Sequence, residues 1–117
     1  MKVSLRKLLS QIPGPPTGQW PDGARSAVGF EHGTMTLEFY APVETDPQQP
    51  HKQDEIYIIQ SGTSKFELED KTMSLAAGDA VFVPAGAEHR FVDFSSDFGT
   101  WVIFWGPEGG ESSEATE

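Results

Sequence analysis

Two histidines and a glutamate have the types and spacing of a metal-binding set. His51 and Glu55 lie four residues apart. Side chains two residues apart along an extended strand face the same side, so an extended path would direct both to one face. The same alternation places Tyr57 on that face and directs Asp54 away from it. One face of this segment therefore carries an imidazole, a carboxylate and an aromatic ring.

The second histidine, His89, follows a sharp turn. Pro84 ends an apolar segment because it lacks a backbone donor, and Gly86 permits the positive φ of a reversal. A strand that begins at His89 would return the imidazole to the interior. Two imidazoles and one carboxylate with open positions suit non-haem Fe(II), and Zn, Ni or Mn also fit. The alternative is a metal-free barrel in which hydrogen bonds hold these side chains.

Short β-type segments separated by turn residues surround these positions. Many strands at about 8–12-residue spacing predict an all-β sandwich or barrel, and nothing after Ile12 has the pattern of a crossover helix. The predicted strands cover residues 24–30, 34–40, 55–60, 64–68, 72–75, 80–83, 89–94 and 99–105. The longest connection, residues 41–54, is rich in proline and glutamine, and a loop of this length in a compact chain favours a functional role.

The N-terminus carries the helical pattern of the chain. Apolar residues recur at positions 5, 8, 9 and 12, Ser4 is placed as an N-cap, and Pro13 ends the pattern. We expect residues 1–23 to form a helix and a loop that cover the barrel, residues 24–105 to form the barrel, and residues 106–117 to be a flexible acidic tail.

Together the two segments resemble the paired motifs of the cupin superfamily. In words, these motifs are Gly, five residues, His-x-His, three or four residues, Glu, six residues, Gly; then Gly, five residues, Pro-x-Gly, two residues, His, three residues, Asn. The positions that match are His51, Glu55 and Gly62 in the first motif and Gly78, Pro84, Gly86 and His89 in the second. The resemblance implies a cupin-type antiparallel barrel or jelly roll.

This resemblance also implies a ligand set and exposes departures from the family pattern. Carried over by position, the metal ligands are His51, Glu55 and His89. Gln49 stands where the family has its first histidine, so either its amide oxygen is a fourth ligand or water takes that place. Val43 replaces the opening glycine and Asp93 the closing asparagine. The implied cofactor is one divalent transition metal: Fe, Mn, Ni or Zn.

Aromatic and apolar side chains are expected to line the pocket around this site. Alternation from Glu55 and His89 places Tyr57 and Phe91 there, and Tyr57 is the nearest candidate for a catalytic base. Three further residues are pocket candidates although no ligand fixes the direction in which they face: Phe39, Trp101 and Ile103. Few cationic residues lie near the pocket, which favours an apolar or aromatic small molecule over a polyanionic one.

Several functions fit such a site. A metal-dependent cupin would be a dioxygenase-like oxidoreductase, or an isomerase or lyase using the metal as a Lewis acid. A non-catalytic module that binds or senses a small molecule is the alternative, and a purely structural dimer is a third possibility. In each case we expect a homodimer, because apolar edge strands need covering.

Composition narrows the choice of partners and location. Of 117 residues, 18 are acidic and 8 basic, for a net charge of −10, so the chain would repel nucleic acid. The chain has no run of 18 consecutive apolar residues, so we predict no membrane-spanning helix. The chain contains no cysteine, which excludes thiolate metal sites and fits the reducing cytoplasm, the location we expect.

Overall fold

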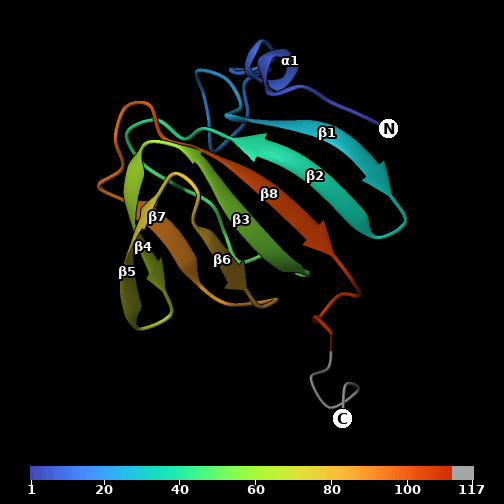
Figure 1. Cartoon of the computed structure of the whole chain (residues 1–117), viewed down its shortest axis with the longest axis vertical. Helices are drawn as coiled ribbons and strands as arrows, with labels where there is room; N and C mark the ends of the chain where they lie inside the picture. The colour runs from blue at the N-terminus through green and yellow to red at the C-terminus, as the bar shows by residue number, and fades with distance from the viewer. Residues whose placement is uncertain (112–117) are drawn as a thin grey trace.

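Two antiparallel sheets face each other in the computed structural model, which describes residues 1–111 (Figure 1). The larger sheet has the strand order β1-β2-β8-β3-β6 and the smaller one β5-β4-β7. The elements are α1 (Leu5–Leu9), β1 (Ser26–His32), β2 (Met35–Tyr40), β3 (Asp54–Ser61), β4 (Thr63–Leu68), β5 (Lys71–Ala76), β6 (Ala80–Val83), β7 (His89–Val92) and β8 (Gly99–Trp105). The all-β architecture predicted from turn spacing is confirmed, and each predicted strand overlaps an observed one.

Helix α1 lies against the outer face of the larger sheet, near β1 and β2 (Figure 1). Ser4 caps it by accepting a 3.3 Å hydrogen bond from the backbone N–H of Lys7. Leu8 is buried and packs in one apolar cluster with Phe39 and Ala27. The helix ends at Leu9, earlier than the apolar pattern predicts.

The main core fills the space between the two sheets. Phe66 on β4 and Phe91 on β7 face Tyr57 on β3, with ring centroids 5.8 and 4.8 Å from the Tyr57 ring. The register aligns Tyr57 with Val102 of β8, and Val102 with Glu38 of β2. The registers with β6 and β1 extend this row to Val81 beside Tyr57 and to Val28 beside Glu38, so Glu38 is its charged member.

The end of the described chain folds back on the barrel. The N–H of Glu111 donates a 3.0 Å hydrogen bond to Asp54 Oδ2, and the N–H of Gly109 donates one of 2.8 Å to the Lys52 carbonyl. Asp54 is buried and also accepts a 2.9 Å bond from the N–H of Ala85. Residues 106–111, expected to belong to a flexible tail, are thus held by specific bonds, whereas positions 112–117 of that tail lie outside the described residues.

Candidate functional site

Glu55 and His89 meet between the two sheets. Glu55 Oε1 lies 2.9 Å from His89 Nε2, and the two residues are 1% and 6% exposed. The alternation predicted for β3 directs Glu55 inward, and the turn after β6 (Ala80–Val83) brings His89 to the first position of β7. The sequence motifs therefore place an acid and an imidazole in contact although 34 positions separate them, 55 to 89.

Tyr57 and Gln48 extend this pair into a hydrogen-bonded group. Tyr57 Oη lies 3.0 Å from His89 Nε2, and the Tyr57 hydroxyl donates a 3.0 Å bond to Gln48 Oε1. Gln48 Nε2 in turn donates a 2.7 Å bond to Asp46 Oδ2. Asp46 also accepts bonds from the Tyr40 hydroxyl at 2.5 Å and the Phe91 N–H at 2.9 Å, which fixes this part of the loop.

The protons of the group follow from these bonds. Burial alone would lower the pKa of His89, but the Glu55 carboxylate and the Ala87 carbonyl, 2.9 Å from Nδ1, outweigh it, so the pKa of His89 is raised. Burial, followed by the charges of Glu55 and Asp46, raises the pKa of Tyr57 well above its usual value. Tyr57 therefore keeps its proton at neutral pH, which does not suit the role of catalytic base in which it was the nearest candidate.

Neither oxygen of Glu55 receives a hydrogen bond, although both are buried. Glu55 Oε1 lies 2.9 Å from His89 Nε2, and the two groups form an ion pair when the imidazole is protonated. A buried carboxylate normally collects donors, because each unpartnered oxygen loses its hydration without compensation. Glu55 is therefore the position in the site where a cation would compensate the largest electrostatic cost.

His51 lies apart from this pair. Its ring stacks on Phe104 with centroids 3.9 Å apart, and its Nδ1 accepts a 3.1 Å bond from the N–H of Gln53. Burial lowers the pKa of His51, and the charge of His89 lowers it further against the opposing effect of Glu55. Within residues 1–111, no three His, Cys, Asp or Glu side chains gather as a metal-binding group. The structure thus brings two of the three predicted ligands, Glu55 and His89, into contact, whereas the third, His51, stacks on Phe104.

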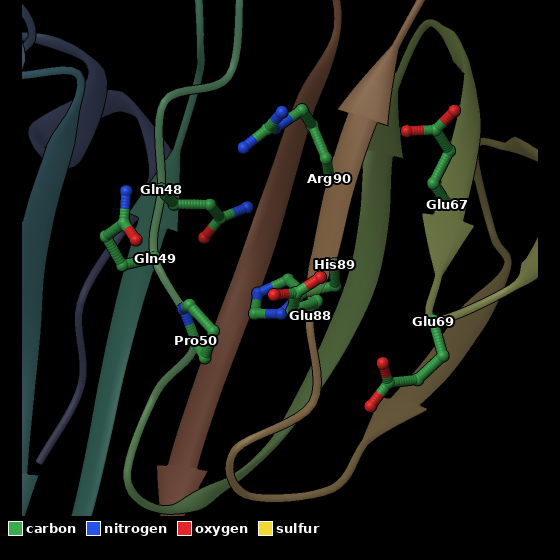
Figure 2. Close-up of a pocket in the computed structure, with 8 residues that line it drawn as sticks. All are labelled: Gln48, Gln49, Pro50, Glu67, Glu69, Glu88, His89 and Arg90. Atoms are coloured by element: carbon green, nitrogen blue, oxygen red, sulfur yellow. The ribbon is translucent and has the colours of Figure 1, made fainter.

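Gln49 and Gln48 take opposite directions in the loop. Figure 2 shows the Gln48 side chain directed toward His89, whereas that of Gln49 projects to the other side of the backbone. Gln48, and not the predicted Gln49, therefore bonds Tyr57 in the site. The signal available in the sequence was the Asp46-Pro47 pair, since an aspartate before proline commonly bonds the backbone two residues on, as Asp46 does with the N–H of Gln48 at 3.3 Å.

The predicted pocket residues divide between two faces of the larger sheet. Tyr57 and Phe91 lie in the core beside His89. Phe39 and Trp101 were placed wrongly: they pack edge-to-face, 5.2 Å apart, in the cluster beneath α1. Ile103 shares the side of Trp101, because residues two apart on β8 (Gly99–Trp105) face the same way. The residues of β8 directed toward the site are Val102 and Phe104.

Two hollows lie near the Glu55–His89 pair: His89 lines the first, and Gln48, which bonds Tyr57, lines both. The rim pocket, about 190 Å³ in volume and drawn in Figure 2, is lined by Gln48, Gln49, Pro50, Glu67, Glu69, Glu88, His89 and Arg90. The inner-face cavity, about 470 Å³, is lined by Thr17, Gly18, Gln19, Trp20, Ala24, Ser26, Glu38, Tyr40, Gln48, Val102 and Phe104. Sequence reasoning missed Glu38, because it placed the adjacent Phe39 in the pocket and alternation then directs Glu38 to the other face of β2.

The chemistry of the donors fits a divalent metal at Glu55 and His89. A carboxylate and an imidazole are both ligands that divalent transition metals accept, and here Glu55 Oε1 and His89 Nε2 lie 2.9 Å apart. The Ala87 carbonyl beside His89 Nδ1 is the type of outer partner that orients a ligating imidazole. The unpartnered carboxylate oxygens point to the same conclusion.

Comparison with known proteins assigns the class. The cupin domain model Cupin_2 matches residues 36–102, more than half of the chain. The protein therefore belongs to the cupin family, as its motifs predict.

Individual relatives share this barrel. An uncharacterized protein of Streptomyces coelicolor is 42% identical over 64 residues, which are 55% of this chain and 61% of the relative, so the match spans less than two thirds of that protein. KdgF from Halomonas sp. superposes with a TM-score of 0.62 at 19% identity, covering 71% of this chain and 80% of that one. A cupin 2 conserved barrel domain protein from Salinispora arenicola gives 0.59 at 19% identity, covering 69% and 74%. At these identities the two structures share the fold.

Within residues 1–111, the structure contains no helix of the length and apolar character needed to span a membrane.

Proposed function

We propose that this cupin binds a small molecule in the inner-face cavity, next to a divalent transition metal held by Glu55 and His89. The observation that carries the proposal is the buried Glu55 carboxylate, which no donor bonds and which faces His89 Nε2 at 2.9 Å. Gln48 lines both the cavity and the rim pocket and accepts a bond from the Tyr57 hydroxyl, which lies 3.0 Å from His89 Nε2, so a ligand in the cavity would be linked to the metal-binding pair through Gln48 and Tyr57.

The protein's own residues have definite roles in this proposal. When bound, the metal would supply Lewis acidity, or dioxygenase-like redox chemistry in the case of iron, at positions that the protein leaves open. Tyr57 keeps its proton and acts as a fixed hydrogen-bonding group, and Gln48 holds it in place. The apolar side chains of Val102 and Phe104 exclude water from one side of the site. His51 becomes a third ligand only if its ring gives up the bond from Gln53.

A second candidate is a metal-free cupin module that binds a small molecule without turnover. The placement of His51 favours the metal-free module, because Phe104 stacks on the face of the ring and the Gln53 N–H bonds its Nδ1. The raised pKa of His89 favours it too, since a protonated imidazole compensates the Glu55 charge without a metal.

Metal titration separates the two candidates. Calorimetry with Mn(II), Fe(II), Ni(II) and Zn(II) on metal-stripped protein would compare wild type with Glu55→Gln, His89→Gln and His51→Gln. The control is His32→Gln, since His32 is exposed at the end of β1. We expect Glu55→Gln and His89→Gln to weaken binding by about 100-fold or more and His32→Gln to leave it unchanged. Thermal melts would check that each variant folds. A wild-type protein that binds none of the four metals would favour the metal-free module.

A further inference from the structure

The inner-face cavity combines aromatic side chains with an acid. Its wall includes Trp20, Tyr40 and Phe104, and its charged residue is Glu38. Trp20 and Phe104 are partly buried and pack against the cluster that contains Tyr40. Among its lining residues there is no lysine or arginine. Aromatic faces and a carboxylate together are the groups that attract an organic cation.

The charge around the cavity is negative. Glu38 and Glu55 both lie on the inner face of the larger sheet, on strands that flank β8. Burial raises the pKa of the Glu38 carboxyl, and the charges of Glu55 and Glu31 raise it further. Arg25 is not among the lining residues; its Nε donates a 2.8 Å bond to the Ala41 carbonyl, and its charge partly opposes the rise in the pKa of Tyr40.

We propose that the inner-face cavity selects a small organic cation, an alkylamine or quaternary ammonium compound, with its charged head between Glu38 and the rings of Trp20 and Phe104. The proposal rests on the proposed function, since it names the ligand class of that same site. A neutral polyol could bond Gln19, Gln48 and the hydroxyls of the wall, but it would leave Glu38 uncompensated, whereas Glu55 already faces His89. An anion would face both carboxyl groups without a cationic side chain in the lining.

The test compares ligands of the same shape and different charge. Choline and its neutral isostere 3,3-dimethylbutan-1-ol would be titrated into the full chain at pH 7 by calorimetry, with glucose as the polyol probe. A cation–π and carboxylate site should bind choline at least about tenfold more tightly than the isostere. We expect Glu38→Gln to remove most of that difference while binding of the isostere stays the same.

Matched controls separate a local effect from a general loss of charge or tryptophan. Asp70→Asn removes an exposed charge at the end of the β4–β5 hairpin, outside the cavity. Trp105→Phe alters a tryptophan that packs on Phe82, with centroids 6.1 Å apart. Both variants should retain the preference for choline, whereas Trp20→Ala should reduce it.

Several results would overturn the proposal. Equal or tighter binding of the isostere or of glucose would show a cavity that does not select charge, and binding of none of the three would do the same. A Glu38→Gln protein with the full preference for choline would remove the acid from the explanation. Each of these results leaves the metal titration of Glu55 and His89 as an independent test of the proposed function.

Discussion

Asp46 is expected to contribute more to stability than any exposed carboxylate in the chain. It is 3% exposed and accepts hydrogen bonds from the Tyr40 hydroxyl, the Gln48 N–H and side-chain amide, and the Phe91 N–H. Tyr40 ends a strand of the larger sheet, whereas Phe91 lies on β7, an edge strand of the smaller one. One carboxylate therefore ties the 41–54 loop to both sheets.

The magnitude follows from what Asp46→Ala would leave behind. Hydrogen bonds to a charged group contribute about 1.5–3 kcal/mol each, and an unsatisfied buried donor costs about 1–3 kcal/mol. The Tyr40 hydroxyl and the Phe91 N–H would both be left without an acceptor. Because the bonds share one acceptor, their contributions are not additive, and we expect a loss of about 3–5 kcal/mol. For a chain of this length that corresponds to a fall in Tm of about 10–25 °C.

Urea unfolding followed by circular dichroism would measure this loss. The matched control is Asp79→Ala, which removes an exposed carboxylate that accepts one bond, 2.8 Å from the N–H of Ala76. The control should cost about 1 kcal/mol or less. If Asp46→Ala fell within 1 kcal/mol of that control, at an unchanged dependence on urea, the carboxylate would not be the tie between the sheets that its contacts indicate.

Two further predictions concern backbone strain and association. Gly62→Ala should lower the free energy of unfolding in urea by about 3 kcal/mol, because φ is 76° and a Cβ would lie 2.7 Å from the Phe98 Cα. The control Gly33→Ala, at φ 59° in open space, should lower it by about 1 kcal/mol. Equal losses in the two variants would contradict this prediction. The homodimer expected from the unpaired strand edges stays a prediction. Phe82 is 49% exposed on the edge strand β6, so Phe82→Lys should shift the protein toward monomer in sedimentation equilibrium. A monomeric wild type would refute the expectation.

The strands could be predicted because their signals are local. Turn residues such as Gly78 and Pro84 mark where each strand ends, and alternation fixes which side chains of β3 face inward. The helix end was misjudged because α1 is stabilised by packing on β1 and β2, not by its own length. The facing of Phe39 and Trp101 could not be read, since hydrophobic residues lie on both faces of a sheet that carries a helix outside and a core inside.

The site could be predicted only where residues lie on regular strands. Glu55 and His89 meet as their motif positions require, 2.9 Å apart. Gln48 was missed because the direction of a loop side chain depends on tertiary bonds, here those with Asp46 and Tyr57. His51 lies before β3 begins at Asp54, so strand alternation does not apply to it.

The unpartnered state of Glu55 follows from the direction of the hydrogen bonds that begin at Asp46. Asp46 Oδ2 accepts the side-chain amide N–H of Gln48, which leaves the Gln48 oxygen to face Tyr57. The Tyr57 proton must then point to Gln48, so the tyrosine presents a lone pair to His89. His89 Nε2 lies 3.0 Å from the Tyr57 oxygen and 2.9 Å from Glu55 Oε1, and Tyr57 itself has no proton left to donate to Glu55. Asp46, which does not contact Glu55, thus determines through Gln48 where the Tyr57 proton points, and this leaves Glu55 available to a cation.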